Sequence, residues 1–217
     1  MNVLRKAVLV LSALALASGC ATSNASDTKK DAAPAASRTG TPAAELRLGY
    51  FANVTHASAV YGVGSGDFQK SLGSTKLSTQ IFNAGPAAVE ALFAGSLDAA
   101  YLGPSPAINA FVKSNGDAIR IVSGATSGGA ALVVAKGITS PQQLKGKIVA
   151  DPQTGGTQDV ALRTWLKGQG FTEDATGAGD VTIRAQENAQ SLQEFQAGRI
   201  AGAWVPEPWA SRLVLEG

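Results

Sequence analysis

The sequence predicts an α/β fold made of two βα lobes that face each other across a central cleft. Short apolar runs alternate with helical segments of about ten residues, which is typical of βα units around a largely parallel sheet. One local plan also occurs twice, beginning at Ala94 and at Ala197. In each copy a helix ends at Ala-Gly, a strand of small residues with one aromatic follows, and Pro-x-Pro opens the next helix. Two similar units of this kind suggest a cleft between them.

The first twenty residues predict an export signal. Arg5 and Lys6 give a positively charged start, residues 7–17 form an apolar run, and small residues lead to Cys20. The run is about half of the roughly 20 residues that a bilayer crossing needs, which indicates a signal peptide and not a membrane span. The pattern is similar to a bacterial lipoprotein signal, with Cys20 as the lipidated residue. The alternative is that Cys20 is a small buried hydrophobic residue.

Residues 21–44 are predicted to form a disordered tether. They are rich in Ala, Ser, Thr and Pro and contain no Leu, Ile, Val or aromatic residue. Such a segment cannot bury enough apolar surface to offset the conformational entropy lost on folding. Folded structure is therefore expected to begin near Glu45.

From Glu45 onward, strands and helices are expected to alternate. The strands are short runs rich in β-branched, aromatic or small apolar residues, and helices start at Pro or small polar residues. Strands are predicted at residues 46–51, 77–82, 99–102, 119–124, 131–134, 148–150, 181–183 and 203–205. Helices are predicted at residues 87–93, 106–113, 158–167, 189–196 and 209–215. In such sheets ligands bind beyond the carboxyl ends of the strands, so the loops after the strands are the candidate site.

These loops carry Ser, Thr, Asn and Gly next to helix starts, where free backbone N–H groups and the helix dipole favour anions. For each loop alone, ordinary helix capping is the alternative. The candidate ligand-binding residues are Asn53, Thr55, His56, Ser105, Ser127, Gly128, Thr154, Thr157, Asn188 and Glu207. Donors of this kind favour a small oxyanion, and only His56 could add a cation. Glu207 either caps the following helix or faces solvent, or else faces the cleft and pairs with an amine.

Composition argues against several other functions. The net charge of +2 and 6% aromatic residues offer neither a basic field nor a stacking platform for nucleic acid. One His, one Cys and dispersed acids do not supply a metal site, and no cofactor is expected. Residues 62–66 are glycine-rich, but their spacing does not match a dinucleotide fingerprint. No Gly-x-Ser-x-Gly elbow follows a strand, so a serine hydrolase is disfavoured.

Several stretches in order resemble the solute-binding proteins of ABC importers for nitrate, sulfonates and taurine. The matching stretches are residues 46–51 with 53–56, 83–86, 94–106, 130–134, 144–147 and 202–209. The resemblance implies a periplasmic-binding-protein fold of type II, with the ligand in the cleft between the lobes and no catalysis. It also implies a small anionic solute, an ABC permease and its ATPase as partners, and a monomer held by a lipid anchor outside the cytoplasmic membrane. The alternative is an enzyme on the same fold that acts on a small anionic or pyrimidine-type substrate.

Members of this family are longer chains that return from the second lobe to the first. On that pattern, residues 45–130 are expected to form lobe 1 and residues 131–217 to form lobe 2. The chain would then stop before the return to lobe 1, so a C-terminally incomplete fold is expected.

Overall fold

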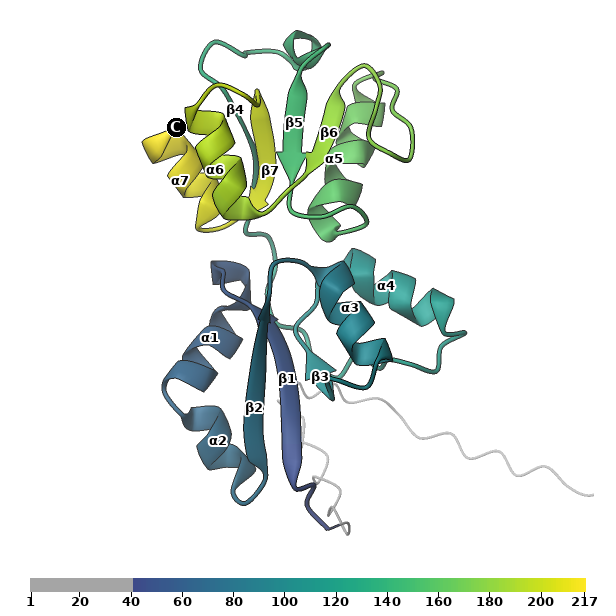
Figure 1. The fold of residues 1–217 in the computed structure, drawn as a ribbon, viewed down its shortest axis with the longest axis vertical. Coiled ribbons are helices and arrows are strands. Elements are labelled where there is room, and N and C mark those ends of the chain that lie inside the picture. The colour runs from purple at the N-terminus through teal and green to yellow at the C-terminus, as the bar shows by residue number, and fades with distance from the viewer. Residues whose placement is uncertain (1–40) are drawn as a thin grey trace, which may run out of the picture. The chain divides into compact units, whose positions relative to one another are not determined.

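A computed structural model describes residues 41–217 of the chain (Figure 1). The predicted signal, the lipidated Cys20 and most of the predicted tether lie outside the described residues. The described part contains two sheets, with strand orders β2-β1-β3 and β4-β7-β5-β6. We refer to β1 through α4 as the first lobe and to β4 through α7 as the second lobe. None of the described helices is long and apolar enough to cross a membrane.

The first lobe is built on a parallel sheet. Its strands are β1 (Glu45–Phe51), β2 (Lys76–Phe82) and the short β3 (Ala99–Ala100). Its helices are α1 (Ala57–Gly64), α2 (Asp67–Leu72), α3 (Gly85–Phe93) and α4 (Pro104–Lys113), with a 3₁₀ turn at Val54–His56. Figure 1 shows α1 and α2 on one side of the strands and α3 and α4 on the other.

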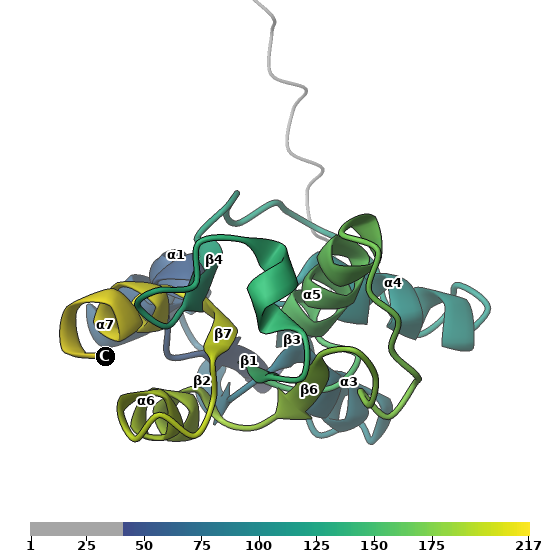
Figure 2. The ribbon, with the colours of Figure 1, turned by 90° about the horizontal axis from the view of Figure 1, so that it is seen from above.

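The second lobe is built on a mixed sheet. Its strands are β4 (Ala130–Val134), β5 (Ile148–Asp151), β6 (Thr182–Ala185) and β7 (Gly202–Pro206), and only β4 runs antiparallel to its neighbour. Its helices are α5 (Thr157–Gly168), α6 (Asn188–Gln196) and α7 (Trp209–Glu216), with a 3₁₀ turn at Pro141–Leu144. In both views α6 and α7 lie together, apart from α5 (Figures 1 and 2).

Helices cover both faces of the second sheet because successive strand residues point to opposite faces. Val149 packs with Leu162 and Leu166 of α5, whereas the next residue, Ala150, packs with Leu192 of α6 and Leu213 of α7. Strand β5, which ends at Asp151, therefore contributes to two hydrophobic clusters, one on each face of the sheet.

The α/β fold with two βα lobes is confirmed, but one predicted strand is wrong. Residues 119–124 form no strand, and Ile121 and Val122 are 83% and 92% exposed within an irregular connection. An extended run becomes a strand only when a neighbour pairs with its backbone groups. Among residues 41–217 no such neighbour pairs with this run.

Two helices, α1 and α2, were not among the predicted elements, and residues 62–66 had been considered only as a phosphate-binding loop and disfavoured. Gly62 is nevertheless inside α1, and a side chain there would overlap the ring of Phe68, with a Cβ 2.3 Å from that ring. Gly66 adopts the left-handed conformation, with φ of 78°, between the two helices. The glycine-rich segment thus allows helix α1 to pack against α2, and it forms no phosphate-binding loop.

Candidate solute-binding site

Three helix starts from the two lobes meet at close range. A Cβ on Gly103, before α4, would lie 2.0 Å from Thr157 Oγ1 at the start of α5. A Cβ on Gly85, the first residue of α3, would lie 2.3 Å from the ring of Pro106. A Cβ on Gly156 would lie 4.0 Å from Pro86 Cδ. Because helix starts carry free N–H groups and the positive end of the helix dipole, their meeting favours negative charge.

The donors at these starts are unequal. Proline at positions 104 and 106 has no N–H group, so Ser105 supplies the free N–H in the first two positions of α4. Helix α5 begins Thr157-Gln158-Asp159 and keeps all three N–H groups. Ser105 and Thr157 are both half-buried at these starts. The sequence-based choice of Ser105 and Thr157 thus names two residues that lie where the lobes meet.

A chain of side-chain amides also crosses between the lobes. Asn83, just after β2, donates from Nδ2 to the carbonyl of Pro152 after β5, at 3.0 Å. Asn188, the first residue of α6, donates from Nδ2 to Asn83 Oδ1 at 3.4 Å. Asn188 is only 5% exposed, and its Oδ1 has no hydrogen-bond partner. The carboxyl ends of β2, β5 and β6 are thereby linked.

The loop after β1 is also tied to the second lobe. The N–H of Val54 donates to the carbonyl of Glu207 at 2.9 Å, and the N–H of Glu207 donates to the carbonyl of Gly129 at 2.9 Å. Within the loop, Thr55 Oγ1 donates to Asn53 Oδ1 at 2.7 Å. Asn53 is buried, and its side-chain oxygen already accepts this hydrogen bond from Thr55.

His56 does not have the environment expected of a cationic residue. It is 7% exposed, its ring stacks on Phe51 with centroids 4.2 Å apart, and Nδ1 accepts the N–H of Phe51 at 3.1 Å. Burial lowers the pKa of the His56 imidazole to about 4. At neutral pH the ring is therefore uncharged, with its proton on Nε2. Sequence reasoning missed this because the charge of a histidine depends on its burial.

A pocket of about 250 Å³, which we call the amide pocket, is lined from both lobes. It combines three aromatic rings, three side-chain amides and one carboxylate. Its lining residues are Phe51, Ala52, Asn53, Ile81, Phe82, Asn83, Glu187, Asn188, Ala189 and Trp209. No Lys, Arg or His is among them. The volume, slightly below that of drug-sized sites, suits a small organic molecule with an apolar part.

The remaining predicted residues lie elsewhere. Ser127, Gly128 and Thr154 are exposed and do not line the amide pocket. The carboxylate of Glu207 accepts the N–H of Ser211 at 3.1 Å in the first turn of α7. Among the alternatives left open for Glu207, the one seen in the structure is a hydrogen bond that caps the helix following it.

Several lining residues were not among the predicted site residues, although some carried a usable signal. Asn83 directly follows β2, much as Asn53 lies two residues after β1, and Glu187 directly precedes Asn188. The rule that selected Asn53 would have selected Asn83 too. The aromatic side chains of Phe51, Phe82 and Trp209 had no such signal, since apolar residues at element ends more often belong to a core.

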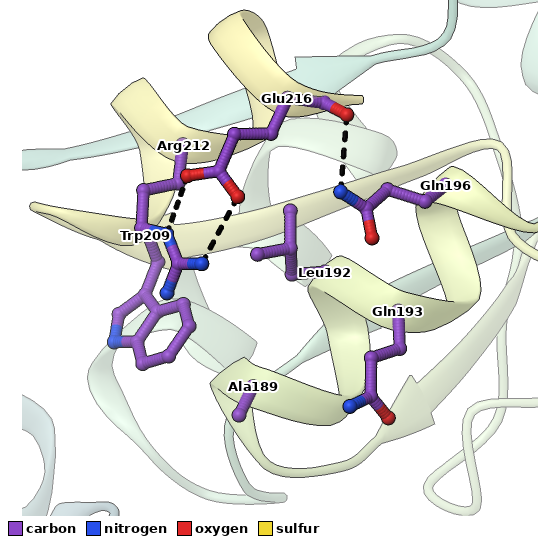
Figure 3. A pocket seen from close by; sticks show the side chains of 7 residues that line it. All are labelled: Ala189, Leu192, Gln193, Gln196, Trp209, Arg212 and Glu216. Carbon is purple, nitrogen blue, oxygen red and sulfur yellow. Dashed lines mark hydrogen bonds and ion pairs between the residues drawn. The ribbon is translucent and has the colours of Figure 1, made fainter.

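A second hollow of about 340 Å³ lies between α6 and α7 (Figure 3). It shares Ala189 and Trp209 with the amide pocket. Its one cation, Arg212, lies 5.0 Å from the Trp209 ring centroid and donates to both carboxylate oxygens of Glu216, at 2.7 and 3.0 Å. Because Glu216 neutralises this charge, the hollow between α6 and α7 is lined by no unpaired cation.

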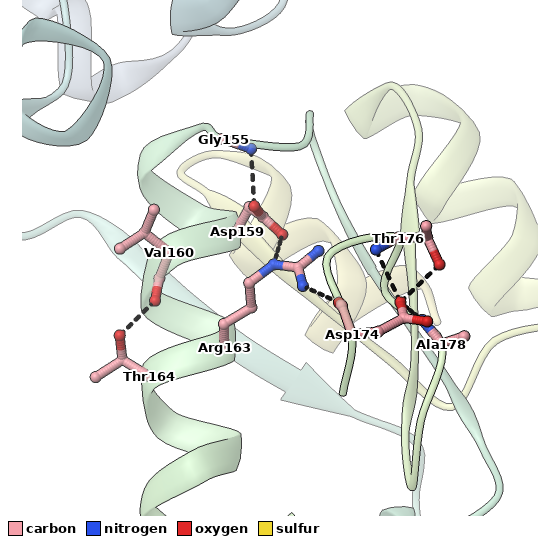
Figure 4. Close-up of polar contacts among 8 residues, drawn as sticks. All are labelled: Gly155, Asp159, Val160, Arg163, Thr164, Asp174, Thr176 and Ala178. Atoms are coloured by element: carbon pink, nitrogen blue, oxygen red, sulfur yellow. Dashed lines mark hydrogen bonds and ion pairs between the residues drawn. The ribbon is translucent and has the colours of Figure 1, made fainter. Parts of the chain in front are cut away.

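Two buried acids lie behind the loop that connects β5 to α5. Asp159 accepts the N–H of Gly155 and the Nε–H of Arg163, both at 2.7 Å (Figure 4). Asp151 is 0% exposed, and both its carboxylate oxygens lack a hydrogen-bond partner. Burial, with a further contribution from Asp159, raises the pKa of Asp151 to about 7. No group of three or more His, Cys, Asp or Glu that could hold a metal occurs within residues 41–217.

Comparison with known proteins places the chain in a family. The model of the NMT1-like family matches residues 39–217. The chain belongs to the NMT1-like family. A protein of Brucella abortus, named only as a binding protein, is 30% identical over 130 residues, which is 59% of this chain and 38% of that protein. The chain thus spans well under half the length of this curated relative.

Solved structures with a similar fold include sulfonate- and nitrate-binding proteins. The alkanesulfonate-binding protein SsuA from Xanthomonas axonopodis pv. citri, bound to MOPS, is 27% identical with a TM-score of 0.63. The match covers 82% of this chain and 60% of that one. The nitrate-binding protein NrtA from Synechocystis is 17% identical with a TM-score of 0.57, and the match covers 80% of this chain and 49% of NrtA. The second likeness shows the fold alone. The predicted resemblance to nitrate and sulfonate binding proteins is confirmed.

Proposed function

We propose that this protein is the extracytoplasmic solute-binding component of an ABC importer and that it binds a small organic oxyanion of the sulfonate type. The observation that carries this proposal is the meeting of the α3, α4 and α5 starts between two lobes. Helix starts with hydroxyl groups bind oxyanions without a cationic side chain. The likeness to an alkanesulfonate-binding protein supports the same chemistry.

In this proposal the two ends of the solute bind differently. The oxyanion accepts hydrogen bonds from the free N–H groups of α5 and from the hydroxyls of Ser105 and Thr157. The organic part packs against Phe51, Phe82 and Trp209 in the amide pocket. An inorganic ion such as nitrate would leave these rings without contact, so the pocket favours an organic solute.

Transport requires that the permease distinguish the loaded protein from the empty one. A solute that contacts both lobes stabilises the arrangement in which they meet, and the permease would recognise this state. The protein would act by binding and not by catalysis, since His56 is buried with Nδ1 accepting a backbone N–H. We further propose a lipid anchor at Cys20, which would hold a monomer beside the permease and its ATPase on the outer face of the membrane.

The test is a thermal-shift and calorimetric screen of the purified protein with alkanesulfonates, nitrate and a simple cation. We expect stabilisation by alkanesulfonates, weaker stabilisation by nitrate and no chemical change in the solute. Thr157→Val should weaken sulfonate binding about tenfold, because it removes a donor to a charged group. Binding of the cation alone, or turnover of any solute, would overturn the proposal. Cys20→Ser should release the protein from membranes, and retention after a high-salt wash would contradict the anchor.

A further inference from the structure

The amide chain between the lobes fixes which way each amide points. The carbonyl of Pro152 can only accept a hydrogen bond, so the NH₂ group of Asn83 must face it. Asn83 Oδ1 then faces Asn188, and because this oxygen can only accept, the NH₂ group of Asn188 must be the donor. Asn188 Oδ1 is therefore an acceptor without a partner, on a side chain that lines the amide pocket and is 95% buried.

Glu187 contributes a negatively charged side chain to the same pocket. It precedes Asn188 in the chain and lines the same pocket. Its carboxylate makes no capping hydrogen bond to α6 and joins none of the ion pairs within residues 41–217. Because the pocket lining has no cationic side chain, nothing in the lining neutralises Glu187.

The buried acceptor of Asn188 requires a hydrogen-bond donor, and a positively charged donor would also pair with the exposed carboxylate of Glu187. We propose that Glu187 and Asn188 form a donor-selecting subsite that binds an ammonium or similar N–H group of the solute. The protein then prefers a zwitterionic organic oxyanion to one without an amine. This inference rests on the proposed function, because the other end of the solute is the oxyanion.

The placement of the two charges is consistent with the helix dipoles. Glu187 precedes the first turn of α6 and offsets the positive end of that helix. The first turn of α4 contains no acid. The first turn of α5 contains Asp159, but its carboxylate is paired with Arg163 at 2.7 Å, so both starts remain available for the oxyanion. Asn83 lies between these two places, because it is bonded to Asn188 and to the loop that leads into α5. In the proposed arrangement one small zwitterion extends from the start of α6 to the start of α5 past Asn83.

The experiment compares two solutes that differ only in the amine. Propane-1-sulfonate and 3-aminopropane-1-sulfonate are titrated calorimetrically into the purified protein near pH 7.5. We expect the amine to bind at least about tenfold tighter, the range of a charged hydrogen bond. In Glu187→Gln, which changes an exposed side chain, the ratio of the two affinities should fall about tenfold. Asn188→Asp adds a carboxylate at the subsite and should raise the ratio.

Glu90→Gln is the matched control. Glu90 is exposed on α3, joins no ion pair within residues 41–217 and does not line the amide pocket, so the ratio should stay unchanged. Equal binding of both sulfonates by the unmodified protein would overturn this inference and leave the proposed function standing. An equal loss for both solutes in Glu187→Gln would do the same. If neither sulfonate binds, the proposed function itself fails.

Discussion

The two lobes bury their apolar side chains to very different degrees. The largest fully buried side chains, among them Leu144, Leu162, Leu166 and Leu213, all belong to the second lobe, as do both hydrophobic clusters of the described residues. In the first lobe, large apolar side chains such as Tyr61 and Phe111 are exposed. Burial of apolar surface is the main stabilising contribution to folding, so the second lobe should carry most of the stability of residues 41–217.

The amide pocket takes its lining residues from both lobes, which differ in core packing. Asn188 begins a helix packed into the core of the second lobe and Glu187 directly precedes it, whereas Asn53 and Asn83 come from the first lobe. Closure of two lobes requires one rigid surface against which the other lobe can move. Because α6 is packed into the larger core, we expect its start to be the rigid part of the site.

The largest expected effect tests the contrast in core packing. Leu162→Ala should lower the free energy of unfolding by about 3–5 kcal/mol, because it opens a cavity in a closed cluster. Leu48→Ala on β1 should cost about half as much, because the surroundings in the first lobe can relax or admit water. Urea unfolding followed by circular dichroism measures both. Equal losses would show that the first lobe is as tightly packed as the second.

A smaller effect is a pH dependence of the free energy of unfolding that differs between the two lobes. In the second lobe, Asp151 has a folded-state pKa of about 7, above its ordinary value of 3.8. The native state then holds the extra proton between these values, so this group should lower the free energy of unfolding as pH rises from about 4 to about 7. We expect a contribution on the order of 3 kcal/mol. Asp151→Asn should remove this contribution, whereas Asp117→Asn, at an exposed site, should leave it. A pH profile that Asp151→Asn leaves unchanged would contradict the assignment.

Much of the fold was predictable because it depends on local pattern. The runs at β1 and β2 and the Pro-x-Pro helix starts carry their own signals, whereas residues 119–124 have a strand pattern without a partner in the described chain. Helix α1 was not predicted, because glycine is a weak helix former and only the packed structure shows that Phe68 leaves no room for a side chain at Gly62. The site was less predictable, since Asn83 and Asn188 are 105 residues apart in sequence and meet only after both sheets form.

The smallest of these effects lies in the first lobe and has the opposite pH dependence. The pKa of His56 is lowered from 6.5 to about 4 by burial, so the unfolded chain binds the extra proton between these values. This group should therefore lower the free energy of unfolding as pH drops from about 6.5 to about 4, by on the order of 2 kcal/mol. His56→Asn can still accept the N–H of Phe51 through Oδ1 but does not titrate, so this contribution should disappear. The measurement is urea unfolding between pH 4 and pH 8 for the unmodified protein, His56→Asn and Asp151→Asn. Because the two contributions oppose each other between about pH 4 and pH 6.5, the unmodified protein should have a shallow profile there. In this range the free energy of unfolding should rise with pH in Asp151→Asn and fall with pH in His56→Asn. The same profile in both variants would contradict separate origins in the two lobes.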